Sequence, residues 1–250
     1  MNIHIFSDKK KMGKEAAKKA AEIILNSIQE KDCTRFVMAT GISQYDFLEN
    51  LVAMDIPWEK TEMFHLDQYL GIGEDHPASF EKFLKDRFID VVHHPNTHLI
   101  QGDPPDSEQE CKRIGNLLNM APIDVIFVGI GENGHIAFND PPADFETEAP
   151  YIIVELDEKC RRQQVGEGWF RTFEEVPTHA ISISIRQILK AEHIICICPD
   201  KRKQKAVYDA LHPDMPITPE VPASVFKIHK NTDVYLDFDS AKLLFSENEK

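Results

Sequence analysis

The sequence predicts an α/β fold in which a single doubly wound, mostly parallel sheet is flanked by helices. Short apolar segments rich in β-branched residues alternate with longer segments in which apolar residues recur every three or four positions. One short segment, Ile123–Val128, is apolar except for Asp124 and is followed by Gly129, Gly131 and Gly134. A strand of this kind is buried on both faces. A three-layer, Rossmann-like arrangement is therefore expected.

The first half of the chain is expected to begin with an edge strand and a long helix. Ile3–Phe6 alternates as an edge strand does, and Lys10–Lys31 carries its apolar residues on one helical face. A capping box, Ser107-x-x-Glu110, is expected to open a later helix. The other strands of this half are expected at 36–39, 61–66 and 97–100, and the other helices at 44–54 and 79–92.

The second half repeats the alternation. After Ile123–Val128, strands are expected at 151–156, 180–185, 194–198 and 234–238, and helices at 201–211 and 223–229. The stretch 141–175 contains a proline- and acid-rich loop and a glycine-containing turn, so we expect it to form a lid over a cleft. Because the chain has no internal repeat or composition break, residues 1–250 are interpreted as a single domain.

Composition excludes several classes of function. The net charge of −14 argues against nucleic-acid binding, which relies on a basic surface. The apolar runs are too short to span a membrane, and the N-terminus lacks a signal-peptide pattern. Five cysteines without a C-x-x-C spacing indicate free thiols in a reducing compartment. A cytoplasmic location is expected.

The candidate site begins just beyond the strand Ile123–Val128. Asn133, His135, Asn139 and Asp140 follow the carboxyl end of this strand, where open α/β sheets bind ligands. A histidine beside a carboxylate is a candidate proton-transfer pair. The alternative is a tight turn with a packed histidine. The glycine spacing and the following prolines do not fit a dinucleotide-binding turn, so neither a nicotinamide nor a flavin cofactor is expected.

Two further segments carry candidate site residues. The loop Thr40-Gly41-Ile42-Ser43 opens a helix and can bind an anion, although Ser43 could instead only cap that helix. Asp67 follows a buried strand, where desolvation would raise its pKa and make it a candidate base. His65 is expected on the same strand face as Asp67, and the two could bind a metal together with His135. No further ligands stand at a recognisable metal-binding spacing, so no metal site is predicted.

A cluster of basic residues opens the helix expected at 201–211. Lys201, Arg202, Lys203 and Lys205 lie at the end where the helix dipole favours negative charge. This cluster therefore requires either a bound anion or wide exposure to solvent.

Three motifs stand out along the chain: FHLDQYLG with HPASF (64–80), GIGENGHIAFNDP (129–141) and ATG (39–41). Together they resemble the glucosamine-6-phosphate deaminase/isomerase family over most of the chain. The resemblance implies conversion of a hexosamine 6-phosphate, the glucosamine or the galactosamine form, to a ketohexose 6-phosphate and ammonia. It implies neither a metal nor a redox cofactor. The related 6-phosphogluconolactonases share the Gly-His pair but typically diverge after it.

The resemblance also implies roles for individual residues. Asp67 matches the acid that moves a proton between C2 and C1, His135 the histidine that assists ring opening, and Asp140 the carboxylate that partners it. The substrate-binding positions that match are the phosphate loop Thr40, Gly41 and Ser43, the phosphate-binding Lys205, and the backbone positions Gly129 and Ala137.

The sequence departs from the family pattern at two places. Asn133 stands where glucosamine-type members carry Asp, and the galactosamine branch also reads N-G-H, so Asn133 is a candidate specificity residue. Gly168 stands where a phosphate-contacting Arg is common; either Arg161, Arg162 or Arg171 is expected to substitute, or the ligand contact differs from that of the family. The alternatives are a 6-phosphogluconolactonase-like hydrolase and a sugar-phosphate-binding regulator without catalysis. Whether the chain forms a homo-oligomer stays open.

Overall fold

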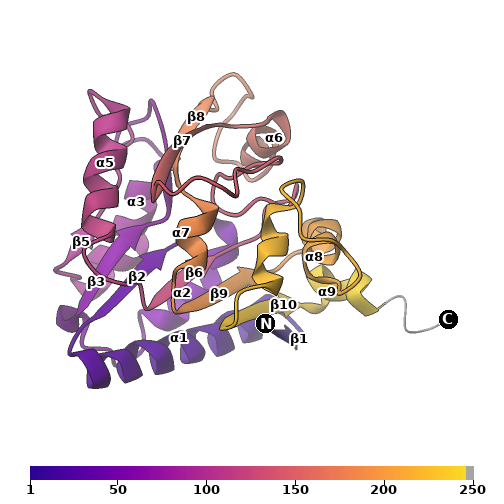
Figure 1. The fold of residues 1–250 in the computed structure, drawn as a ribbon, viewed down its shortest axis with the longest axis horizontal. Helices are drawn as coiled ribbons and strands as arrows, with labels where there is room; N and C mark the ends of the chain where they lie inside the picture. The colour runs from indigo at the N-terminus through magenta and orange to yellow at the C-terminus, as the bar shows by residue number, and fades with distance from the viewer. Residues whose placement is uncertain (246–250) are drawn as a thin grey trace.

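The structure is a computed structural model that describes residues 1–245 (Figure 1). Seven parallel strands form the main sheet in the order β1-β10-β9-β6-β2-β3-β5. This arrangement confirms the predicted α/β class and the parallel sheet. The strands are β1 (Asn2–Phe6), β2 (Thr34–Met38), β3 (Thr61–His65), β5 (Thr97–His98), β6 (Val125–Val128), β9 (His193–Cys198) and β10 (Thr232–Asp237).

The strand order reverses between β2 and β6. From β2 the chain builds outward through β3 and β5, then returns to the other side of β2 with β6 and continues outward through β9 and β10. Ligands bind open α/β sheets at such a reversal, beyond the carboxyl ends of the strands. The loops after β2 and β6 are therefore the first places to look for a site.

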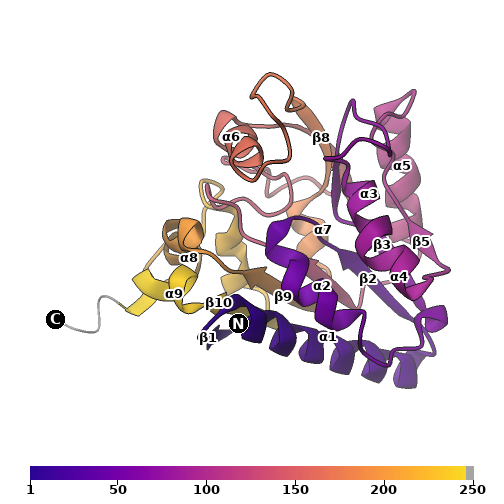
Figure 2. The same ribbon diagram turned by 180° about the vertical axis from the view of Figure 1, so that it is seen from behind.

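Helices cover both faces of this sheet because its strands bury side chains on both sides. In β2, Phe36 and Met38 join the core on one face, and Val37 joins the core on the other. One face is covered by α1 (Lys9–Lys31), α2 (Tyr45–Leu51), α3 (Phe80–Leu84) and α4 (Asp90–Val92), as Figure 2 shows. The other face is covered by α5 (Ser107–Leu118), α7 (Ile185–Leu189), α8 (Gln204–Leu211) and α9 (Phe238–Phe245).

A second, antiparallel sheet was not foreseen. It consists of β4 (Asp67–Tyr69), β8 (His179–Ile183) and β7 (Tyr151–Glu155), in the order β4-β8-β7. The strands expected at 151–156 and 180–185 form, but they pair with each other. The side chains of β7 alternate between covered and exposed, as a sheet with one solvated face requires. Helix α6 (Glu158–Gly166) follows β7 and packs on this sheet through an apolar cluster of its own.

Several local details differ from expectation. The helix α5 is capped by Asp106, whose carboxylate accepts from the N–H groups of Glu108 and Gln109, both at 3.0 Å, so the predicted capping box at Ser107 is wrong. Glu110 instead accepts from the N–H of Gln101.

Within residues 1–245 no helix is long and apolar enough to cross a membrane. The remaining helical turns are η1 (Ile42–Gln44), η2 (Trp58–Lys60), η3 (Lys85–Ile89), η4 (Lys201–Lys203) and η5 (Pro222–Lys227).

Candidate active site

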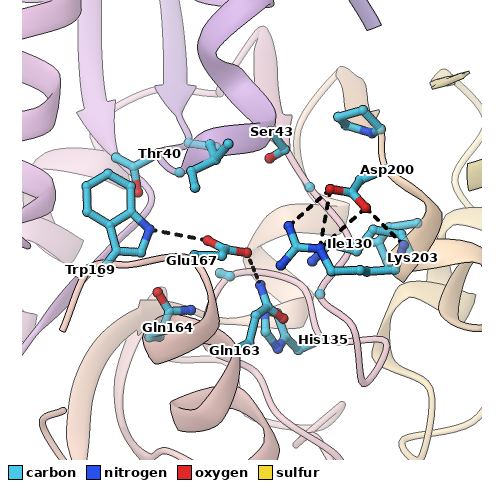
Figure 3. Close-up of a pocket in the computed structure, with 18 of the residues that line it drawn as sticks. Thr40, Ser43, Ile130, His135, Gln163, Gln164, Glu167, Trp169, Asp200 and Lys203 are labelled. Atoms are coloured by element: carbon cyan, nitrogen blue, oxygen red, sulfur yellow. Dashed lines mark hydrogen bonds and ion pairs between the residues drawn. The ribbon is translucent and has the colours of Figure 1, made fainter. Parts of the chain in front are cut away.

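A cavity of about 380 Å³ opens at the carboxyl ends of the main strands (Figure 3). Its walls come from the loops that follow β2, β3, β6, β9 and β10, and from α6 with the turn after it. Segments that are far apart in sequence therefore meet near the carboxyl ends of β2 and β6, where the strand order reverses. The sequence-predicted residues that line this cavity are Thr40, Gly41, Ser43, Asp67, Gly129, His135 and Ala137.

The loops after β2 and β6 meet at one end of the cavity. A Cβ atom at Gly129 would lie 3.6 Å from Ser43 Oγ and from Gln44 Nε2, which shows how closely the two loops approach. The Ser43 hydroxyl accepts a hydrogen bond from Gln44 Nε2 at 3.0 Å, and the helix α2 that follows has no side-chain cap. Its own proton is therefore available to a ligand, and the alternative of a purely capping Ser43 is not supported.

Asp67 presents a carboxyl group to the cavity without a protein partner. The residue is only 5% exposed, and its carboxyl group makes no hydrogen bond or ion pair within residues 1–245. Burial raises the pKa of Asp67 to about 8. Pairing of Asp67 with Ser182 of β8 fixes the backbone there. The carboxyl group can thus exchange a proton with a ligand near neutral pH.

His65 does not join Asp67 at the cavity. Its ring is fully buried, its Nδ1 accepts from the N–H of Ile100 at 3.4 Å, and burial lowers its pKa to about 3. A neutral packed histidine explains the residue. The alternative of a metal site built from His65, Asp67 and His135 is therefore not supported.

His135 and Asp140 form a pair at the cavity wall. The imidazole lines the cavity, and its Nδ1 lies 3.0 Å from Asp140 Oδ1. Burial alone would raise the pKa of Asp140, but the His135 imidazole, the Asn133 amide and the Asp157 N–H together lower it, so Asp140 is ionised at neutral pH. Gly131 packs on the ring, because a Cβ there would come within 2.3 Å of His135 Nε2.

Asn133 holds this pair through three contacts. Its Nδ2 donates to Asp140 Oδ1 at 3.0 Å and to Asp157 Oδ2 at 3.1 Å, and its Oδ1 accepts from the N–H of His135 at 3.1 Å. An aspartate could not donate the first two bonds. Because Asp157 already places a second carboxylate beside Asp140, an amide at position 133 suits this cluster.

Replacing Asn133 with Asp is expected to lower stability at neutral pH. The change removes two donors and puts a third carboxylate beside Asp140 and Asp157, so the cost is about 1–3 kcal/mol. Because like charges raise the pKa of the cluster, the loss should grow as the pH rises and shrink as a carboxyl group protonates. Thermal unfolding between pH 5 and 8 measures it. Adding Asp157→Asn should recover most of the loss, and a variant as stable as the wild type at pH 8 would contradict this account.

The turn that carries His135 is fixed by Asn139. Asn139 Nδ2 donates to the carbonyl oxygens of Ile136 and Ile183 and to Ser182 Oγ, at 2.9, 2.8 and 3.2 Å. Ala137, which lies between Ile136 and Asn139 in the chain, has a φ of 52°, a conformation that is uncommon outside glycine. The rigid anchoring to β8 holds this backbone against the cavity.

The segment 141–175, expected to be a lid, contributes polar side chains to the cavity, but none of its arginines lines it. Glu167 lines the cavity and accepts from Gln163 Nε2 at 2.8 Å and from Trp169 Nε1 at 3.2 Å (Figure 3). Arg161 was wrongly placed: it lies away from the cavity and donates to the carbonyl oxygens of Phe173 and Val176 at 2.9 and 2.8 Å. It braces its own loop. Arg162 and Arg171 do not line the cavity either.

Lys205 also lies away from the cavity, and the lysine of this cluster that lines the cavity beside Lys201 is Lys203. Lys205 is 73% exposed and pairs with Asp209, one turn further along the same helix. Lys203 lines the cavity and is only 6% exposed, and its ammonium group has no hydrogen bond or ion pair within the described chain. The neighbouring Arg202 is already engaged by Glu132 and Asp200. Lys203 is thus the buried cation that an anionic ligand would meet.

Comparison with known proteins agrees with this geometry. A sequence model of the family described as glucosamine-6-phosphate isomerases/6-phosphogluconolactonase matches residues 7–235. The chain belongs to this family. Among family members, it is similar to the glucosamine-6-phosphate deaminase of Clostridium acetobutylicum, with 34% identity over 92% of this chain and 96% of that protein. The enzyme of the same name from Bacillus pumilus is 33% identical over 97% of this chain and all of that protein.

Solved structures of the family share the fold. A monomeric glucosamine-6-phosphate deaminase superposes with a TM-score of 0.89 at 26% identity, over 97% of this chain and 100% of that chain. The 6-phosphogluconolactonase of Trypanosoma brucei gives a TM-score of 0.80 at 14% identity, over 97% and 98% of the two chains, which shows the fold alone.

Sequence reasoning missed several cavity residues of this family member. The basic cluster at 201–205 signalled an anion, but not which lysine would face it. Gln163, Gln164, Glu167 and Trp169 gave no signal beyond the expectation of a lid, because their approach to the cavity depends on how α6 packs.

Proposed function

We propose that the protein is a cytoplasmic aldose–ketose isomerase and deaminase that converts a hexosamine 6-phosphate into a ketohexose 6-phosphate and ammonia. One observation carries this proposal. An unpaired carboxyl group of raised pKa, Asp67, shares a single cavity with the His135–Asp140 pair and the buried cation of Lys203. Proton transfer on a phosphorylated sugar needs these three parts.

The phosphate group would bind at Lys203 and the loop after β2. Lys203 is largely buried, and its ammonium group makes no hydrogen bond or ion pair among the described residues, so a phosphate would satisfy it with charge-assisted hydrogen bonds. Thr40, Gly41 and Ser43 line the same cavity and add hydroxyl and backbone donors. With a net charge of −14, the protein needs such a local cluster to hold an anion.

The reaction would use two proton-transfer groups. The His135 imidazole, held beside ionised Asp140, moves the proton between the sugar's O1 hydroxyl and its ring oxygen, and the ring opens. The Asp67 carboxylate then takes the C2 proton and returns it to C1, which leaves an imine at C2. Water adds to this carbon, and ammonia leaves. Asn133 acts as a positioning residue, and the backbone at Gly129 and Ala137 lines the sugar.

The cover of the site would be the segment 141–175. Helix α6 and the turn after it line the cavity with Glu167, which offers two acceptor oxygens to the sugar's hydroxyl or ammonium groups. We propose that this segment closes as a lid on a single catalytic domain of residues 1–250. Asn133 is proposed to mark the galactosamine branch of the reaction.

Ammonia release tests the proposal. Purified protein is assayed side by side on glucosamine 6-phosphate and galactosamine 6-phosphate, with no added metal. Preference for the galacto sugar would assign Asn133 to specificity, and preference for the gluco sugar would show that Asn133 is tolerated in that reaction. Release from neither would overturn the proposal. Tight calorimetric binding without turnover would then indicate a regulator, and hydrolysis of 6-phosphogluconolactone would indicate a lactonase.

A further inference from the structure

A buried thiol lies behind the His135–Asp140 pair and takes no part in the proposed reaction. Cys160 is in the first turn of α6, is 1% exposed, and is held by its N–H, which donates to Asp157 Oδ1. Three potential ligand atoms, His135 Nδ1, an Asp140 carboxylate oxygen and Cys160 Sγ, all lie within 4.8 Å of one another. They come from two separate segments, the loop after β6 and α6.

The spacing of these atoms is close to that of a tetrahedral metal centre. Zinc binds nitrogen and oxygen at 2.0–2.2 Å and sulfur at 2.3 Å, which places neighbouring ligand atoms about 3.3–3.8 Å apart. His135 Nδ1 and Asp140 Oδ1 are already 3.0 Å apart. The separations to Cys160 Sγ are at most 4.8 Å, so they need to contract by about 1.5 Å at most.

His135 Nδ1 is itself without a hydrogen bond. The Asp140 oxygen is near enough, but it does not lie in line with the ring N–H, and this buried nitrogen is unsatisfied within the described chain. An unsatisfied buried polar atom destabilises the folded protein. A cation bound in the ring plane would satisfy it. Meanwhile the Asn133 amide and the Asp157 N–H hold the Asp140 carboxylate in place.

We propose that His135, Asp140 and Cys160 bind a divalent cation of the zinc type, and that this cation inhibits the enzyme. One sulfur, one nitrogen and one oxygen ligand favour zinc over magnesium or calcium, which prefer oxygen alone. As the metal–sulfur bond forms, the thiol proton passes to solvent. The inhibitory part rests on the proposed function: the metal takes Asp140 away from the imidazole and ties α6 to the loop that carries His135.

Cobalt binding tests the site without any assay of activity. Titration of the reduced, metal-free protein with Co²⁺ should produce the near-ultraviolet absorbance of a cobalt–thiolate bond at one equivalent, and Zn²⁺ should displace it. Cys160→Ala should abolish the band. Cys33→Ala, which removes an exposed thiol far from the cluster, is the matched control and should keep the band. If Cys160→Ala folds poorly, Asp140→Asn should weaken the Co²⁺ affinity at least tenfold.

Inhibition by Zn²⁺ tests the consequence. The wild type and Cys33→Ala should be inhibited together, whereas Cys160→Ala should keep its basal ammonia release and need at least tenfold more Zn²⁺. A wild type without the cobalt–thiolate band, or a band retained in Cys160→Ala, would overturn the site. A clear band in a protein that releases no ammonia would leave the site standing and overturn the proposed function. A band with no inhibition would overturn the inhibitory role alone.

Discussion

Asp67→Asn is expected to lower ketose and ammonia formation by about 10²–10⁴-fold while the sugar phosphate still binds. The variant keeps the shape of the side chain but removes the group that would carry the proton from C2 to C1. The other parts of the cavity, including Lys203, stay unchanged. Turnover and calorimetric affinity for the hexosamine 6-phosphate, measured on the same preparation, separate a loss of chemistry from a loss of binding.

The raised pKa of Asp67 predicts how activity and stability change with pH. Only the ionised carboxylate can accept the C2 proton, so kcat/KM of the wild type should rise with pH up to about 8 and level off above it. The free energy of unfolding changes in the opposite direction and falls as the pH rises. An acid whose folded pKa lies above its ordinary value destabilises the fold increasingly as the pH rises toward the folded value.

The same variant should therefore be more stable than the wild type at high pH. Between pH 5 and about 8 the difference in unfolding free energy should widen by about 1.4 kcal/mol per pH unit in favour of Asp67→Asn, and it should level off above that range. Thermal or denaturant unfolding across this range measures it. Asp239→Asn, which changes an acid at the rim of the same cavity, is the control and should alter turnover less than about threefold. Full activity in Asp67→Asn would contradict the assignment of the base.

Local patterns in the sequence predicted the main elements well because helix and strand periodicities depend on near neighbours. The strand Ile123–Val128 was expected from its apolar run, and β6 forms at Val125–Val128. The loops after β2, β3 and β6 could be placed together in advance, because parallel strands bring their carboxyl ends to one edge. Thr40, His135 and Asp67 were therefore identified before their contacts were known.

Features that depend on tertiary packing could not be predicted in this way. The pairing of β7 with β8 instead of the main sheet depends on long-range contacts that a single strand pattern does not record. Arg161 lies in a polar helix, and which carbonyl groups it meets depends on the path of the loop 167–178. Cys160 gave no signal, because its proximity to Asp140 results from the packing of α6.

Lys203→Met is expected to raise KM for the hexosamine 6-phosphate so that kcat/KM falls by about 10²-fold. Methionine keeps the apolar stem and most of the length, but the phosphate loses a charge-assisted partner, a loss of about 2–5 kcal/mol in desolvated charge pairs. Inorganic phosphate should lose its ability to compete with substrate in this variant. Any slow turnover of unphosphorylated glucosamine should be unchanged, which would locate the loss at the phosphate end of the cavity.

Lys205→Met provides the matched control, because the two lysines lie two residues apart where the chain turns into α8. Lys203 lines the cavity and Lys205 does not, because residues two apart on a helical turn point to nearly opposite sides. Lys205 is 73% exposed, and its ion pair with Asp209 is worth about 1 kcal/mol at most. Its removal should change kcat/KM less than about twofold. A larger loss from Lys205→Met than from Lys203→Met would move the phosphate to the separate hollow that Lys205 lines with Asn133 and Asp157, and the cavity beside Asp67 would then lack its anion.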